Sequence, residues 1–230
     1  MSNIVKNTTF PNLLDLIAPH SCRGCGCLGQ PLCDCCKNHI VKNNSNFCPR
    51  CKQPKVTGQC PKCKNFPPTY FIDERSGLIN QLIHDYKYHS VRALTQSLAE
   101  LLDIVLEKNL PKNSILVPLP TATNHIRSRG FDHTQKIAKH LSKLRHYQLQ
   151  PVFIRTKNTV QVGSNRKTRL TQAEQAFMVN PKIKINQTAT YILFDDVWTT
   201  GASMTIAVKK LRKLGVKNII IALLAVSRLD

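Results

Sequence analysis

The chain has 230 residues, of which 42% are hydrophobic, and this is enough for one α/β domain with a real core plus a small module. Its 33 Lys and Arg against 13 Asp and Glu give a net charge of +20, which favours polyanionic partners such as nucleic acid, phosphorylated metabolites or an anionic membrane. There is no apolar run of about 18 residues and no signal-peptide pattern, so we expect a cytoplasmic protein that does not insert into a membrane.

All ten cysteines fall within residues 22–63. Because the cytosol keeps thiols reduced, this spacing favours metal binding over a redox or disulfide cluster. Four C-x2-C pairs are present, and each such turn aims two thiolates at one point, which is half of a tetrahedral zinc shell. We therefore predict two zinc ribbons and two structural Zn²⁺ ions, with Cys27 and Cys35 as spare thiols in the first ribbon. The predicted ligands are Cys22, Cys25, Cys33 and Cys36 in the first ribbon and Cys48, Cys51, Cys60 and Cys63 in the second.

A proline-containing stretch separates the cysteines from the rest of the chain. Residues 65–71 contain Pro67 and Pro68 and are interpreted as a linker. The polar segment before it cannot bury enough surface to fold without metal, so zinc is expected to form its core. We predict an N-terminal helix and double zinc ribbon over residues 1–66 and an α/β domain over residues 67–230.

Apolar periodicity marks the elements of this second domain. Leucines at helical spacing indicate helix within 78–107, and Ile137, Leu141 and Leu144 define an amphipathic helix over 131–144. The predicted strands cover 114–120, 151–155, 191–196 and 218–226, a helix covers 203–214 and ends at Gly215, and 156–175 is predicted as a long polar loop that runs into a short helix.

The near-continuous apolar strands alternate with helices, which predicts a mostly parallel, twisted sheet with helices on both faces. Ligands of such sheets bind beyond the carboxyl ends of the strands. Residues 195–203 lie at one of these ends. Between Glu107 and Glu174 the only acidic residue is Asp132, whereas 13 Lys and Arg fall in the same span. A phosphate site combined with a polyanion-binding surface explains this excess better than a solvated basic surface alone.

Two adjacent carboxylates, Asp195 and Asp196, follow a buried strand and precede a turn rich in hydroxyl groups. A Walker B strand is excluded because the chain has no matching phosphate loop. Helix capping needs only one aspartate, and a second one beside it would be repelled. A phosphoribosyl site uses the whole stretch: the carboxylates accept hydrogen bonds from ribose hydroxyls, and the turn binds a 5-phosphate through N–H and hydroxyl donors. Gly201 would allow close approach of the backbone.

Residues 191–203, "YILFDDVWTTGAS", resemble the thirteen-residue phosphoribosyl pyrophosphate (PRPP) motif of type I phosphoribosyltransferases. The wider chain resembles the ComF (competence protein F, ComFC) family, which joins a double zinc ribbon to such a domain. The resemblance rests on "HDYKYHSVRAL" (84–94), "VPLP" (117–120), "RSRGFDHTQKIA" (127–138) and the stretch 155–177, and it covers nearly the whole chain. Asp132 and His133 replace the usual Asn-Gln of the family.

This resemblance implies a type I phosphoribosyltransferase fold and a PRPP site in which Mg²⁺ accompanies the pyrophosphate. Asp195 and Asp196 would be the catalytic carboxylates, and the loop after "VPLP" would hold the pyrophosphate. The implied PRPP-binding residues are Asp195, Asp196, Thr199, Thr200, Gly201, Ala202, Ser203, Pro120, Thr121, Arg127 and Arg129. Candidates for nucleic-acid binding or for a closing loop are Lys87, Arg155, Arg166, Lys167 and Arg169.

The family resemblance implies a cytosolic role in natural transformation, in which single-stranded DNA is handled after uptake, with PRPP, single-stranded DNA and other competence proteins such as a helicase as partners. Two functions follow from these expectations. The first is a phosphoribosyltransferase with an unidentified acceptor. The second is a zinc-dependent protein that binds single-stranded DNA and keeps the PRPP site as a sensor without turnover. The sequence identifies no general base, and the acceptor stays open.

Overall fold

A computed structural model describes residues 19–42, 46–55, 58–89, 91–106, 110–111, 113–156 and 175–227. Its helices are α2 (Asp34–Lys42), α3 (Gly77–Tyr88), α4 (Leu94–Val105), α5 (Thr123–Arg129), α6 (His133–Arg145) and α8 (Ala202–Lys213). Its strands are β1 (Thr69–Glu74), β2 (Ile115–Pro118), β3 (Gln148–Leu149), β4 (Phe153–Arg155), β5 (Phe177–Val179), β6 (Tyr191–Trp198) and β7 (Ile219–Val226).

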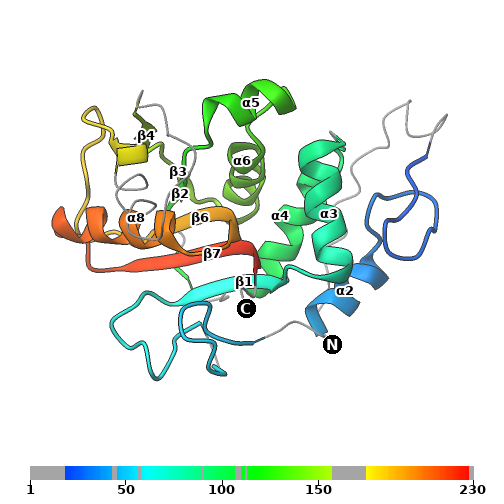
Figure 1. Ribbon diagram of the computed structural model, residues 1–230, viewed down its shortest axis with the longest axis horizontal. Helices are drawn as coiled ribbons and strands as arrows, with labels where there is room; N and C mark the ends of the chain where they lie inside the picture. Colours follow the sequence, from blue (N-terminus) through cyan, green and yellow to red (C-terminus); the bar gives the residue numbers. More distant parts are fainter. Residues whose placement is uncertain are drawn as a thin grey trace.

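Five of the strands form one parallel sheet in the order β1-β7-β6-β2-β3. In the centre of the sheet, Leu193 of β6 pairs with Ile221 of β7 on one side and with Val117 of β2 on the other. Strands β4 and β5 form a separate antiparallel pair. The prediction of a mostly parallel sheet flanked by helices is therefore confirmed (Figure 1).

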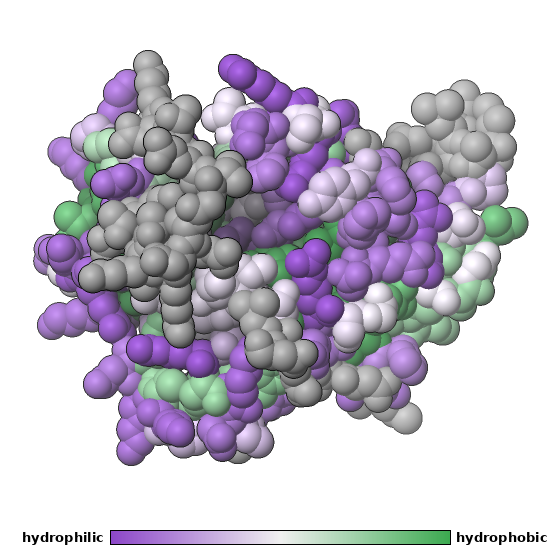
Figure 2. Space-filling model, in the orientation of Figure 1, coloured by the Kyte–Doolittle hydropathy of each residue, from purple (hydrophilic) through white to green (hydrophobic). Residues whose placement is uncertain are grey.

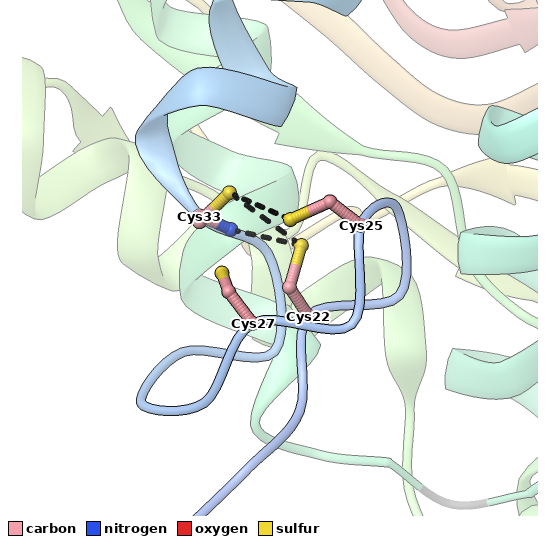
Figure 3. A group of neighbouring side chains, drawn as sticks. All are labelled: Cys22, Cys25, Cys27 and Cys33. Carbon is pink, nitrogen blue, oxygen red and sulfur yellow. Dashed lines mark hydrogen bonds between the residues drawn. The ribbon is translucent and has the colours of Figure 1, made fainter.

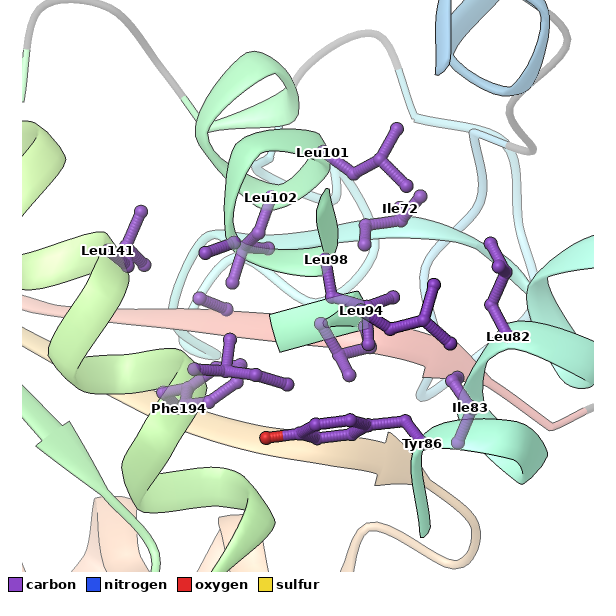
Figure 4. Close-up of a cluster of buried hydrophobic side chains, with 14 of the residues drawn as sticks. Ile72, Leu82, Ile83, Tyr86, Leu94, Leu98, Leu101, Leu102, Leu141 and Phe194 are labelled. Carbon is purple, nitrogen blue, oxygen red and sulfur yellow. The ribbon is translucent and has the colours of Figure 1, made fainter. Parts of the chain in front are cut away.

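Alternate residues of the central strands face two separate cores, because successive side chains of a strand point to opposite faces. Ile192 and Phe194 pack into a core with helices α3, α4 and α6, which supply Leu82, Leu98 and Leu141 (Figure 4). Tyr191 and Leu193 of β6 belong to the core on the other side, together with Ala207 and Leu211 of α8.

The two cysteine-rich modules contribute to opposite cores. Cys22 and Leu32 of the first module, together with Ile40 of α2, belong to the core beneath α3 and α4. Phe47 and Phe66 of the second module belong to the core beneath α8, where Phe66 meets Trp198 edge to face at a ring distance of 5.9 Å. The cysteine-rich segment therefore packs against both faces of the sheet.

The structure differs from the sequence-based boundaries in several places, and the predicted strand 151–155 is β4, outside the parallel sheet. The expected linker 65–71 runs into β1, because the chain after Pro68 pairs with β7 from Thr69 onward. The helical region 78–107 contains two helices, α3 and α4. Strand β6 contains both aspartates, as predicted, but continues two residues beyond the predicted end at 196, to Trp198.

Hydrophilic side chains predominate on the face shown in Figure 2. In the described part of the chain, every helix is too short or too polar to cross a membrane.

Candidate functional site

A hollow of about 220 Å³ opens at the carboxyl ends of β2 and β6. A smaller hollow of about 50 Å³, lined by the turn after β6, adjoins it and shares Asp195 and Ser203 with it. This is the edge at which a parallel sheet binds its ligands. The larger hollow is lined by Lys87, Leu119, Pro120, Thr121, Ala122, His125, Arg129, His133, Thr134, Arg155, Phe177, Asp195, Asp196 and Ser203.

The two aspartates have different surroundings although they are neighbours in the chain. Asp196 is buried, and its Oδ2 contacts both the Lys87 ammonium on α3 and His133 Nε2 on α6, the latter at 2.7 Å. Asp195 Oδ1 accepts a hydrogen bond from the Asp196 backbone N–H at 2.9 Å. Asp196 thus has two side-chain partners within the protein, whereas Asp195 is held by the backbone N–H of its neighbour, and both carboxylates line the hollow.

These surroundings shift the pKa values of the two aspartates in opposite directions. Burial raises the pKa of Asp195 well above its ordinary value, and the charge of Asp196 raises it further. Burial alone would also raise the pKa of Asp196, but the His133 hydrogen bond and the charge of Lys87 outweigh it and hold that pKa well below its usual range. The pair therefore carries one firmly ionised carboxylate and one that favours its proton until a ligand donates to it.

The turn after β6 is shaped by Gly201, whose φ of +71° lies in the left-handed region that favours glycine. A Cβ on this residue would lie 2.0 Å from Cζ2 of Trp198, which is buried. Trp198 is thus part of the core and holds the turn in place. Thr200 Oγ1 accepts a hydrogen bond from the Ala202 N–H at 3.4 Å, and α8 begins at Ala202 with its first N–H groups beside the small hollow.

Basic groups from three other elements complete the larger hollow. Arg129 lies at the end of α5, Lys87 on α3 and Arg155 on β4. Arg155 Nε donates to the carbonyl oxygen of Pro120 at 3.0 Å, and Thr121 Oγ1 donates to Oδ1 of Asp132 at 3.0 Å. The loop after β2 is therefore held between a cation and a helix cap, since Asp132 also caps α6 through the Gln135 N–H.

Most of the predicted PRPP-binding residues meet at these two hollows. Asp195, Asp196, Pro120, Thr121, Arg129 and Thr199–Ser203 all line one or both of them, and so do Lys87 and Arg155 from the second group of candidates. Arg127 is different: its side chain is exposed on α5 and does not line either hollow. Arg166, Lys167 and Arg169 lie outside the described residues.

Sequence reasoning missed several residues of the site. His133 was noted without a role, yet it contacts Asp196 across 63 positions of sequence. His125, Thr134 and Phe177 also line the larger hollow. The signal for His133 was its place in the stretch 127–138, but only the packing of α6 against β6 brings it to the carboxylate.

The cysteines gather into two groups, each of which could hold a zinc ion. In each group the four sulfurs lie within 4.8 Å of one another. A tetrahedral zinc with bonds of about 2.3 Å separates its sulfurs by about 3.8 Å, and the distances of 3.6 Å from Cys33 Sγ to Cys22 Sγ and Cys25 Sγ fit this spacing (Figure 3). Backbone N–H groups of Cys33 and Gly24 lie 3.4 Å from Cys22 Sγ, as suits a thiolate ligand.

The second group is the predicted set, Cys48, Cys51, Cys60 and Cys63. The first group differs from prediction by one member, because Cys27, taken as a spare thiol, stands where Cys36 was expected. Cys36 is nevertheless close, since its thiol interacts with those of Cys33, Cys22 and Cys25 and its Sγ would lie 2.6 Å from a Cβ on Gly24. Five thiols therefore surround a site that needs four, while Cys35 is exposed.

Comparison with known proteins points to competence proteins. No family model matches the chain. Competence protein ComFC of Bacillus subtilis is 27% identical over 201 residues, which cover 81% of this chain and 80% of that protein. Competence protein ComFC of Streptococcus pneumoniae is 22% identical over 222 residues, which cover 92% and 90%. The expected likeness to this family is thus confirmed over most of the chain.

Two solved structures are similar at low overlap. One is described as the allosteric regulatory enzyme of purine biosynthesis, with a TM-score of 0.43, 12% identity and coverage of 61% of this chain and 29% of that one, so the chain spans under a third of it. The other is purine phosphoribosyltransferase from Pyrococcus horikoshii, with a TM-score of 0.33, 16% identity and coverage of 63% and 80%. By its sequence relatives and its paired cysteine clusters, the chain is similar over most of its length to the competence proteins named ComFC.

Proposed function

We propose that this protein binds PRPP with Mg²⁺ and acts as a phosphoribosyltransferase-like protein in natural transformation. The observation that carries the proposal is the meeting of two carboxylates, three basic side chains and the turn at residues 199–203 at one sheet edge. PRPP has two vicinal hydroxyls on its ribose and phosphate groups at both ends of the sugar. The carboxylates would match the hydroxyls, and the turn and the basic side chains would match the two phosphate ends.

Each part of the ligand has a matching part of the site. Asp195 and Asp196 would accept hydrogen bonds from the ribose hydroxyls, and their charge would favour a developing cation at the sugar. The first N–H groups of α8 and the hydroxyls of Thr200 and Ser203 would donate to the 5-phosphate. Thr121, Arg129 and Arg155 would donate to the pyrophosphate, whose remaining charge Mg²⁺ offsets when bound.

The charge of the hollow supports an anionic ligand. Lys87, Arg129 and Arg155 outnumber the two carboxylates, and Lys87 is already paired with Asp196. In the described part of the chain, the buried Nε of Arg129 has no hydrogen-bond acceptor. A buried donor without an acceptor is unfavourable, so a phosphate oxygen at this position would be bound with little competition.

Titration calorimetry with Mg²⁺–PRPP tests the site. Asp195→Asn and Asp196→Asn should each weaken binding by about tenfold or more, because an amide replaces a charged acceptor of hydroxyl hydrogen bonds. Asp103→Asn is the matched control, since Asp103 pairs with Arg145 away from the hollow. Equal affinity in all four proteins would refute the assignment of the carboxylates.

Catalysis and sensing are separated by a second measurement. Pyrophosphate release should be followed with Mg²⁺–PRPP in the presence of each nucleobase and of single-stranded DNA. Release with one of them would establish a transferase and identify the acceptor. Tight PRPP binding without release would instead favour the sensor that binds single-stranded DNA, for which the net charge of +20 is the favouring observation.

A further inference from the structure

His133 is a buried histidine between a cation and an anion. Its Nε2 lies 2.7 Å from Oδ2 of Asp196, and Nη1 of Arg129 lies 3.0 Å from its Nδ1 and 3.5 Å from its Nε2. Only 4% of its surface is exposed, although it lines the larger hollow. The helix that carries it begins at this residue, so its position is fixed by the cap at Asp132.

These contacts assign a protonation state to the imidazole. A guanidinium can only donate, so the nearer contact with Arg129 requires Nδ1 to carry a lone pair. The short contact with the Asp196 carboxylate then needs a hydrogen on Nε2. The neutral Nε2–H tautomer satisfies both contacts, whereas an imidazolium would set an N–H group against an N–H group of Arg129.

The other groups around His133 are accounted for in the same way. From α3, Lys87 pairs with the same Asp196 oxygen, and the Tyr86 hydroxyl donates to the His133 carbonyl. Burial raises the pKa of Tyr86 to about 12, so it stays protonated near neutral pH. From α5, His125 lines the same hollow, and its pKa is lowered chiefly by burial and then by the charge of Arg129. Asp132 caps the helix, and Asp195 lies beside Asp196.

We propose that anion binding at Arg129 is coupled to the uptake of one proton by His133. A phosphate group that draws the Arg129 guanidinium away leaves the Nδ1 lone pair free, with a polyanion now beside it. A proton from solvent then binds to Nδ1, while Nε2 keeps its hydrogen bond to Asp196. The imidazole thereby becomes a cation between the carboxylate and the bound phosphate.

This coupling rests on the proposed function, because it assumes that the anion at Arg129 is the pyrophosphate of PRPP. It makes the affinity depend on pH in a defined direction. Because the free protein holds the neutral imidazole, the proton must be taken from solution. The affinity of the wild type relative to that of His133→Gln should therefore fall as pH rises, by up to about tenfold per pH unit for one linked proton.

Calorimetry in buffers of different ionisation enthalpy, such as HEPES and Tris, measures the coupling directly at pH 7.5. The wild-type chain should take up on the order of one proton more per PRPP bound than His133→Gln, because any proton that Asp195 releases is lost equally from both proteins. His133→Gln should still bind PRPP, since its amide can donate to Asp196 but does not titrate. His133→Leu removes that donor as well and should lose affinity in addition. Inorganic pyrophosphate serves as a second ligand that requires Arg129 but no ribose contact.

Two further histidines are the matched controls. His125→Gln removes a second imidazole from the same hollow, and His140→Gln removes one from α6 outside it. Both variants should keep the proton uptake of the wild type. Equal uptake in the wild type and in His133→Gln, or loss of the wild-type value in His125→Gln, would overturn the coupling. Failure of the wild type to bind PRPP would refute the proposed function, and pyrophosphate binding would then still test the coupling. Failure to bind either ligand would overturn both.

Discussion

Two neighbouring aspartates at the hollow differ in acidity because their contacts differ. Asp196 is held by Lys87 and His133, so its carboxylate is ionised in the folded protein. Asp195 is ionised only at a cost, because it is desolvated next to that charge. Under the proposed function, the carboxylate paired within the protein and the carboxylate available to a ligand are thus adjacent in sequence.

Stability measurements should separate the two aspartates. Asp196→Asn should lower the free energy of unfolding by about 2 kcal/mol or more, because Lys87 and His133 lose their anionic partner. Asp195→Asn should leave stability unchanged or raise it, since burial and the neighbouring charge of Asp196 disfavour the ionised Asp195 more than Lys87 favours it. Urea unfolding at pH 7 measures both, and equal losses would contradict this division.

The pH dependence follows from the same contacts. The folded pKa of Asp196 is lowered, so its contribution is present above the ordinary value near 3.8 and is lost as pH falls. The folded pKa of Asp195 is raised, so its contribution is lost as pH rises. The stability gain of Asp195→Asn over wild type should therefore grow from pH 4 toward neutral pH, and a gain that shrinks would be the wrong sign.

At the scale of elements, the sequence predicted what depends on local pattern. The apolar runs of β6 and β7 and the periodicity of α6 and α8 placed these elements to within a few residues. Strand β1 was missed because Pro67 and Pro68 immediately precede it, and its pairing partner β7 lies about 150 residues later. The same limit applies to the site. The carboxylates and the turn form one local motif that the sequence shows, whereas Lys87, Arg155 and His133 come together only through packing.

The first cysteine module shows the same limit. Spacing alone favoured Cys36 as the fourth ligand, but the loop that follows Cys25 also brings Cys27 to the other sulfurs (Figure 3). Cys36 stays in contact through helix α2, whose Lys37 is anchored by Glu100 of α4 at 2.6 Å. One candidate is thus on an exposed loop and the other on a fixed helix.

Because five thiols surround the first site, Cys27 and Cys36 should substitute for each other. Cys27→Ser and Cys36→Ser should each retain two zinc ions per chain, whereas the double variant, which leaves three thiols at this site, should retain one. Metal analysis of the purified proteins measures this directly. Cys35→Ser is the control, because Cys35 is exposed and outside the group. Loss of one zinc in either single variant would identify that cysteine as the required fourth ligand.

For the whole molecule, the two cysteine modules and the sheet share their cores. Phe47 and Phe66 pack in the core beneath α8, and Cys22 and Leu32 pack in the core beneath α3 and α4. Removal of one module would therefore expose apolar surface on the sheet. Trp198 links the second cysteine module to the turn after β6. It contacts Phe66 on one side and leaves no room for a side chain at Gly201 on the other.

The net charge of +20 predicts that any binding of single-stranded DNA weakens as the salt concentration rises. Exposed lysines lie on α6 and α8, among them Lys139, Lys143 and Lys213, outside the hollow. If single-stranded DNA binds there through phosphate contacts, each contact releases about 0.7 of a counterion. For about five contacts, the affinity for an oligothymidine should fall about a hundredfold between 50 and 200 mM salt, as measured by fluorescence anisotropy.

Charge-reversal variants and added PRPP show where on the protein the single-stranded DNA binds. Lys139→Glu with Lys143→Glu should weaken binding and reduce the salt slope by about one to two, since two phosphate contacts are lost. If the DNA strand binds on these helices, saturating Mg²⁺–PRPP should leave the salt slope unchanged. PRPP would occupy the basic side chains of the hollow, Lys87, Arg129 and Arg155, and not the lysines of α6 and α8. A slope that falls when PRPP is added would place the DNA phosphates in the hollow itself, and an affinity that ignores salt would exclude phosphate contact as its source.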